Sequence, residues 1–302
     1  MFHLTTLRLF YFMDLRKFKV NCSDLGDLMS SNLKSKALTQ RQEQEMIFYL
    51  NKERELTAFQ EFNFRKYVQK QLEYNPNVLS AATKHMMVKM YCKFLYEKTT
   101  ISQGSDDFFS VMKGLSAEND SIKLLSSIDG INYLKNETRF SNRYIKGYPD
   151  IVDYKHKKVI DIKTSTDIVT FMNNHDSSLD KKYYYQMQGY LELTKMGYGE
   201  IVYCLVDAPK ELIDYEIRKL KSKLYLRGYS DDMIAPVTER LYNNMVFDSI
   251  PYKRRIIRYN VYRDKDDINL IYEKVKKCKK WIANLNKKHI NENDRHGISK
   301  EL

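Results

Sequence analysis

The most constraining feature of this sequence is a short hairpin-like stretch in which charged residues stand at positions suited to a protein core. Residues 146–165 read KGYPDIVDYKHKKVIDIKTS, and the apolar, β-branched runs on either side of YKHK are typical of strands. Asp150, Asp161 and Lys163 interrupt these runs. Because an unpaired buried charge is strongly unfavourable, acids and a lysine inside core-like strands call for a specific role.

The hairpin can be given a register by placing its turn at residues 156–157. The predicted cross-strand pairs are then Asp150 with Lys163 and Val152 with Asp161. Because side chains alternate along a strand, these four residues project from one face of the hairpin. Ile160 and Ile162 then point from the other face into the core.

Two neighbouring carboxylates on one sheet face suit a divalent cation, because Mg²⁺ prefers oxygen ligands. Asp150 and Asp161 would supply two oxygens, and the main-chain carbonyl of Ile162 is a candidate third ligand. Glu118, on the inward face of a preceding helix that Ser116 is expected to cap, is a candidate fourth. The alternative is that the acids lie on a solvated sheet face and form ordinary surface ion pairs with the neighbouring lysine.

These residues resemble the motif of the PD-(D/E)XK nuclease superfamily. Residues 149–150 match the PD of the motif. Residues 161–163, DIK, match its second half, with Asp as the acidic residue, and Glu118 precedes both parts. The resemblance implies that Glu118, Asp150 and Asp161 hold one or two metal ions. It also implies that the lysine of DIK positions or activates the attacking water.

A second motif follows in YYYQMQGYLEL, where Gln186 and Tyr190 are four residues apart and share one helix face. This pair resembles the QxxxY motif of the RecB-like, lambda-exonuclease and YqaJ-like branches, in which both residues flank the active site and contact DNA. The alternative is an amphipathic helix that packs an aromatic ring into the core. The resemblance covers 114–208, and FKVNCSDLGDLM near the N-terminus is also similar to the opening of phage-type members.

The expected fold is α/β, a restriction-endonuclease-like core of a helix, three strands, a helix and a strand, with helical additions at both ends. We expect a mainly helical N-terminal lobe over 1–113, the nuclease core over 114–208, and C-terminal helices with a basic strand, packed on the core, over 209–302. Residues 101–113 are predicted to connect lobe and core, and 167–180 to form a loop.

The charge of the chain favours a polyanionic partner. Its 302 residues carry a formal net charge of +12, and clustered lysines and arginines gain affinity by releasing counterions from phosphates. The alternative is a basic but solvated surface. The stripe of Lys253, Arg254, Arg255 and Arg258 is open to either interpretation. The candidate DNA-binding residues near the motifs are Lys146, Thr164, Ser165, Lys181, Lys182 and Tyr183.

The resemblance implies a metal-dependent DNA nuclease. Among such nucleases we expect an exonuclease that resects double-stranded DNA ends in phage-type recombination or replication. An endonuclease or nickase of the same fold and a non-catalytic nucleic-acid-binding or virion-associated protein remain alternatives. The expected cofactor is Mg²⁺ or Mn²⁺, and the four cysteines form no CxxC pair, so an iron–sulfur cluster is not expected. Expected partners are DNA and a single-strand annealing protein, with a homo-oligomer left open; we expect no membrane association and a cytoplasmic location.

Other catalytic classes lack their motifs. No GxxxxGK[ST] or GxGxxG follows a predicted strand, which argues against a nucleotide-binding motor on this chain. No GxSxG is present either, so a serine hydrolase has no support.

Overall fold

The computed structural model describes residues 17–30, 38, 40–72, 79–96, 105–175 and 178–298. The chain divides into two compact units. The first unit comprises residues 1–18, 27–99 and 270–302, and the second comprises 19–26 and 100–269. All residues of the predicted catalytic site belong to the second unit, which is therefore the unit that bears on function.

The described residues of the first unit lie mainly in helices. These are α3 (Gln40–Leu50), α4 (Ala58–Leu72), α5 (Ala81–Tyr96) and most of α11 (Lys265–Ile298). Tyr91 of α5 donates a hydrogen bond to Asn286 of α11, and Lys279 of α11 donates one to the carbonyl of Phe18 at 2.6 Å. No helix among the described residues combines the length and apolar composition that crossing a bilayer requires.

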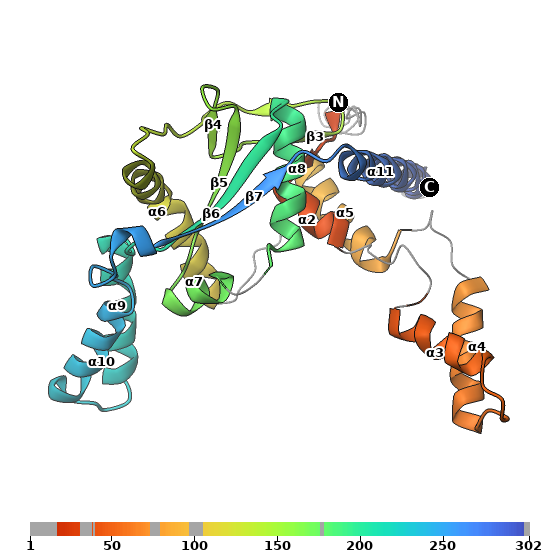
Figure 1. Ribbon diagram of the computed structural model, residues 1–302, viewed down its shortest axis with the longest axis horizontal. Coiled ribbons are helices and arrows are strands. Elements are labelled where there is room, and N and C mark those ends of the chain that lie inside the picture. The colour runs from red at the N-terminus through yellow and green to blue at the C-terminus, as the bar shows by residue number, and fades with distance from the viewer. Residues whose placement is uncertain are drawn as a thin grey trace. The chain divides into compact units, whose positions relative to one another are not determined.

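The second unit contains two sheets (Figure 1). The larger has the order β4 (Ile151–Asp153), β5 (Lys158–Thr164), β6 (Tyr198–Cys204), β7 (Ile256–Tyr262). Its central pair β5–β6 is parallel and both outer pairs are antiparallel. The smaller has the order β1 (Val20–Asn21), β3 (Ile145–Gly147), β2 (Phe140–Ser141). The larger sheet with its covering helices forms the predicted α/β core, so the expected fold class is confirmed.

Helices cover the two faces of the larger sheet. On one face, Ile122 and Leu125 of α6 (Ser105–Asp129) form an apolar core with Ile160 and Ile162 of β5, as predicted from the alternation of the strand. The other face of β5, which carries Asp161, packs against α8 (Lys181–Thr194). The charged residues of the motif thus lie between the sheet and α8.

The helix before the motif is longer than predicted. α6 begins at Ser105 and runs through Gly114, so residues 105–113 are not a connection and the boundary placed at 113–114 falls inside a helix; residues 101–104 lie outside the described part. Ser116 is not an N-cap, because its hydroxyl donates to the carbonyl of Met112 within the helix at 2.6 Å. A single glycine lowers helix stability by only about 1 kcal/mol, which the packed face of this helix offsets.

A second correction concerns the segment expected to be a loop. Residues 168–175 form α7 (Ile168–His175). The side chain of Asp167 accepts a hydrogen bond from the N–H of Thr170 at 2.8 Å, which is the contact of an N-capping residue. Phe171 is buried on this helix. The β-branched residues and asparagines of the segment have low helix propensity, and the cap and the buried ring outweigh it.

The predicted hairpin register is wrong by two residues. Val152 pairs with Val159, and Asp153 with Lys158, so neither predicted cross-strand pair is formed. The chain turns over four residues, 154–157, because Asp153 holds the turn through the N–H of His156 at 3.0 Å and its ring Nδ1 at 2.7 Å. A shift of two preserves the face on which each side chain lies, so the predicted grouping of the acids survives the error.

Other helical elements also belong to the described part of the second unit. α2 (Cys22–Ser30), whose first residues belong to this unit, approaches α8 so closely that a Cβ on Gly26 would lie 2.3 Å from the carbonyl oxygen of Lys182. α9 (Lys210–Tyr225) and α10 (Asp231–Asn243) lie side by side as a helical hairpin (Figure 1). The short η2 (Tyr252–Arg254) leads into β7.

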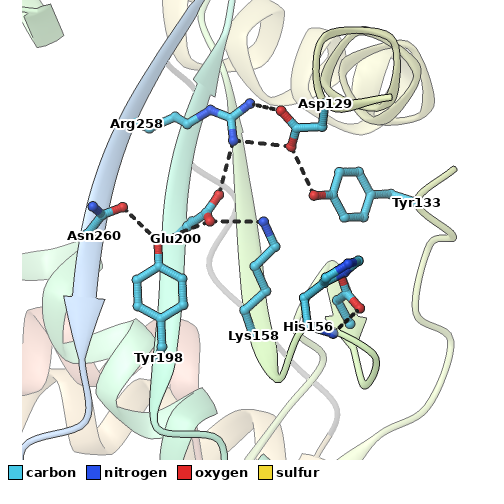
Figure 2. Close-up of polar contacts among 9 residues, drawn as sticks. Asp129, Tyr133, His156, Lys158, Tyr198, Glu200, Arg258 and Asn260 are labelled. Atoms are coloured by element: carbon cyan, nitrogen blue, oxygen red, sulfur yellow. Dashed lines mark hydrogen bonds and ion pairs between the residues drawn. The ribbon is translucent and has the colours of Figure 1, made fainter. Parts of the chain in front are cut away.

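A polar cluster joins the C-terminal end of α6 to the sheet (Figure 2). Arg258 of β7 pairs with Asp129 of α6 and with Glu200 of β6, the latter at 3.4 Å. Lys158 of β5 also pairs with Glu200, at 2.9 Å. Arg258 is therefore engaged within the protein, which favours the structural interpretation for this member of the predicted basic stripe.

Candidate active site

A cavity of about 520 Å³ opens where β5, α6, α7 and α8 meet. All the predicted catalytic residues line it: Glu118, Asp150, Asp161, Lys163, Gln186 and Tyr190, together with Ile162. These residues come from α6, from the residue before β4, from β5 and from α8. The fold therefore brings to one place the residues that the sequence motifs single out.

Asp150 is fixed to the strand that carries the second half of the motif. Its Oδ2 accepts a hydrogen bond from the N–H of Ile162 at 2.6 Å. Burial raises the pKa of Asp150 above its ordinary value, and the charge of Asp161 adds to the increase, while the Ile162 N–H and the Lys163 charge oppose it. Burial and the charge of Asp161 therefore both disfavour the charged form of Asp150.

Lys163 lies in the same group of charges. Its Nζ is 2.8 Å from Oδ2 of Asp161 and 4.5 Å from the centre of the Tyr183 ring. Burial lowers the pKa of Lys163, but the charge of Asp161 and the contact with it outweigh burial, so the net pKa lies above its ordinary value. Lys163 is therefore a cation at neutral pH.

Gln186 connects the acid and the lysine. Its Nε2 donates to Oδ1 of Asp161 at 3.2 Å and to the hydroxyl of Tyr190 at 3.1 Å, and its Oε1 accepts from Nζ of Lys163 at 3.3 Å. Gln186 and Tyr190 are 6% and 4% exposed, so these contacts are shielded from water. Because Gln186 and Tyr190 are four residues apart, they lie on the same face of α8. Gln186 contacts Asp161 and Lys163 of β5, and Tyr190 contacts Gln186.

Tyr190 is seated against the small sheet because of a glycine. A Cβ on Gly147 of β3 would lie 2.7 Å from Cε1 of the Tyr190 ring, closer than packed atoms approach. Any larger residue at this position would displace the Tyr190 ring, whose hydroxyl accepts the hydrogen bond from Gln186.

The three predicted metal-binding carboxylates do not form a ready-made ligand group. Among the described residues, no set of three or more His, Cys, Asp or Glu side chains is arranged to hold a metal ion. Glu118 instead pairs with Lys135 at 3.0 Å, while Asp150 and Asp161 each have the partners described above. The three carboxylates line one cavity, and their joint role as metal ligands stays a prediction.

The chemistry of the pocket nevertheless suits a hard divalent cation. Oδ2 of Asp161 is buried and accepts no hydrogen bond from the described residues, although the Lys163 ammonium lies beside it as an ion pair. Asp150 supplies a second carboxylate from the same strand edge, where the main chain of Ile162 also lines the cavity. Carboxylate and carbonyl oxygens are the ligands that Mg²⁺ and Mn²⁺ prefer, so the donor set fits such an ion.

The predicted DNA-binding residues divide into two groups. Thr164, Ser165 and Tyr183 line the cavity. Lys146, Lys181 and Lys182 do not: Lys146 lies on β3, and Lys181 and Lys182 begin α8. The structure thus brings only the first group to the candidate active site.

Several lining residues were not foreseen from the sequence. Tyr203 could have been found, because it pairs with Lys163 in the parallel register and so shares its face. Asp180 could also have been found, since its side chain caps α8 by accepting from the N–H of Lys182 at 2.8 Å. Lys135 does not line the cavity but pairs with Glu118; it lies in an irregular segment and has no local signal. Ser110, Thr170 and Asn174 were missed because they lie where a connection and a loop were expected, and Thr166 falls between the expected strand and that loop.

Comparisons with known families find no match by sequence. No family model matches the chain. No curated protein matches it either.

Solved structures, in contrast, match over most of the chain. A phage-related exonuclease from Haemophilus somnus 129PT is 22% identical, with a TM-score of 0.59 over 90% of this chain and 96% of that chain. The alkaline exonuclease LHK-Exo from Laribacter hongkongensis is 12% identical, with a TM-score of 0.50 over 93% of this chain and 94% of that one. The same exonuclease in complex with dAMP gives 13% identity and the same TM-score. The chain therefore has the fold of the phage-related and alkaline exonucleases, as its PD-(D/E)XK-like motif predicted.

Proposed function

We propose that this protein is a metal-dependent deoxyribonuclease that hydrolyses phosphodiester bonds. The observation that carries the proposal is the contact set around Asp161, in which Lys163 and Gln186 converge on one buried carboxylate beside Asp150. The exonuclease fold supports it, as does the formal net charge of +12.

Asp150, Asp161 and the main-chain carbonyl of Ile162 would hold the divalent ion, with Glu118 as a further ligand once it leaves Lys135. Such an ion supplies a water of lowered pKa and neutralises charge on the phosphate. We propose Mg²⁺ or Mn²⁺ because both prefer oxygen ligands.

Lys163 acts in this proposal as a fixed positive charge. Its raised pKa keeps the ammonium protonated at neutral pH, so it is suited to orient the attacking water or a phosphate oxygen rather than to remove a proton. Gln186 holds both Lys163 and Asp161, which confines the two groups to one relative position. Tyr190 in turn supports Gln186 from the side of the small sheet.

By analogy with the exonucleases of the same fold, we propose resection of double-stranded DNA ends in phage-type recombination or replication. We propose that the protein acts in the cytoplasm and that its partner is a single-strand annealing protein. A homo-oligomer is compatible with this proposal. The rival proposal is an endonuclease or nickase built on the same site.

Incubation of the purified protein with linear, nicked and circular duplex DNA, with and without Mg²⁺, tests the proposal. We expect loss of the linear form only, and only with the metal. Cutting of circular DNA would select the endonuclease. DNA binding without cleavage of any form, with Mn²⁺ as well as Mg²⁺, would reject the enzyme in favour of a binding protein.

A further inference from the structure

A lysine that the proposed chemistry does not use lies fully buried beside the candidate active site. Lys113 of α6 is only 1% exposed. Its Nζ donates to the carbonyl of Thr166 at 2.9 Å and lies 4.9 Å from the centre of the Phe247 ring. The ring belongs to a residue that is itself fixed, because the N–H of Phe247 donates to Oδ1 of Asp207 at 2.7 Å.

Burying the Lys113 ammonium costs free energy, because the charge loses its contact with water. Burial lowers the pKa of Lys113 to about 8, while the charges of Asp207 and Asp167 act in the opposite direction. Within the described part of the chain, neither acid forms an ion pair with this lysine, so the charge is only partly compensated. A methionine of similar length would fill the site without desolvating a charge, so packing alone does not account for a lysine here.

The contact of Lys113 joins the two chain segments that form one wall of the cavity. Thr166 follows the DIK motif at the end of β5, and its hydroxyl also donates to Oγ of Ser110 on α6 at 3.1 Å. The same helix carries Glu118. Ser165, the residue before Thr166, also lines this wall and is buried.

We propose that Lys113 is a positioning residue of the candidate active site: its ammonium holds the turn 165–167 against α6 and thereby fixes the spacing between the DIK strand and the helix that carries Glu118. The inference rests on the proposed nuclease function. A purely structural role for Lys113 predicts a different result. Replacing a residue that only stabilises the fold should lower stability and activity together.

The test compares Lys113→Met with Lys123→Met, a matched control on an exposed face of the same helix, where Lys123 forms an ion pair with its helix neighbour Asp120 at 2.8 Å. Three properties are measured: kcat and KM on linear DNA with Mg²⁺, the thermal midpoint, and amide hydrogen exchange of the Ser165 N–H. This N–H is bonded to the carbonyl of Cys204 at 2.8 Å and so reports on the turn.

For Lys113→Met we expect kcat to fall about 10-fold or more with little change in KM, because small displacements of reacting groups have effects of this size. Exchange at Ser165 should become faster, and the thermal midpoint should stay the same or rise. Lys123→Met should match the parent in all three properties. Parallel loss of activity and thermal midpoint would overturn the inference, as would parental kcat with parental exchange.

The two proposals fail in different ways. If the parent cleaves DNA and Lys113→Met cleaves it equally well, the nuclease stands and the positioning role is rejected. If the parent cleaves no DNA, the nuclease is rejected and exchange at Ser165 decides: unchanged exchange overturns the positioning of the turn, and faster exchange at an unchanged thermal midpoint supports it.

Discussion

The candidate chemistry converges on Asp161, which contacts both Lys163 and Gln186, while its Oδ2 accepts no hydrogen bond within the part of the chain that the structure describes. Asp161→Asn keeps the shape of the side chain and removes its charge. We expect cleavage to fall about 100-fold or more, the size of effect seen when one electrostatic stabiliser is lost. Circular dichroism should show a folded protein, and gel-shift assays should show retained DNA binding. Cleavage at the parental rate would exclude Asp161 as a metal ligand.

The charge of Lys113 predicts how stability depends on pH. Its folded pKa of about 8 lies below the ordinary value of 10.5, so the unfolded chain binds more protons between these two values. Stability of the parent relative to Lys113→Met should therefore rise as pH increases from 8 to 10.5, by about 3 kcal/mol at 1.36 kcal/mol per pKa unit. Urea unfolding of both proteins across this range measures the difference. A constant or falling difference would contradict the assigned charge state.

Residues are also where the sequence proved most and least informative. Asp161, Lys163, Gln186 and Tyr190 were singled out by their resemblance to short family motifs, and strand alternation and helical spacing, which are local properties, placed them on shared faces. Lys113 and Lys135 were not predicted, because their roles depend on partners distant in the chain. The same holds for the cluster at the end of α6, whose Glu200 and Arg258 come from different strands.

At the scale of elements, replacing either of two helical glycines by alanine should change the stability of the protein in opposite directions. In α2, a methyl group on Gly26 would meet the backbone of α8 at 2.3 Å, whereas at Gly114 in α6 nothing lies within 4 Å of the added Cβ. Gly26→Ala should destabilise the protein by about 1–3 kcal/mol, because two helices must separate. Gly114→Ala should stabilise it by about 0.5–1 kcal/mol through helix propensity. Thermal unfolding distinguishes them, and equal shifts would argue against the close contact of α2 with α8.

Elements also show why boundaries were harder to predict than types. The core strands and α8 were recognised from their periodicity. The start of α6 was missed because its Ser, Asp and Gly residues read as a connection, although Lys113, Ala117 and Ser121 form a buried face of the helix. α7 was missed because its cap and one buried ring, rather than propensity, stabilise it.

At the scale of the whole molecule, the net charge of +12 predicts a salt-dependent interaction with DNA. Each phosphate neutralised by a lysine or arginine releases condensed counterions, so log K should fall linearly with log salt, with a slope of about −0.9 per phosphate on duplex DNA. Fluorescence anisotropy from low to moderate salt measures this slope. Lys181→Ala combined with Lys182→Ala should weaken binding and leave metal affinity unchanged. Affinity that does not vary with salt would mean that the basic residues serve solubility alone.

The position of β6 in the sheet has a consequence for synthesis of the chain. β6 is paired on one side by β5, but its other edge is covered only by β7, which is made after the whole α9–α10 hairpin. A growing chain that has reached residue 204 but not 262 therefore presents an open edge whose Ile201 and Val202 are buried in the finished fold. Aggregation during translation should accordingly be greatest for chains that end within the hairpin and should stop once β7 has emerged and paired.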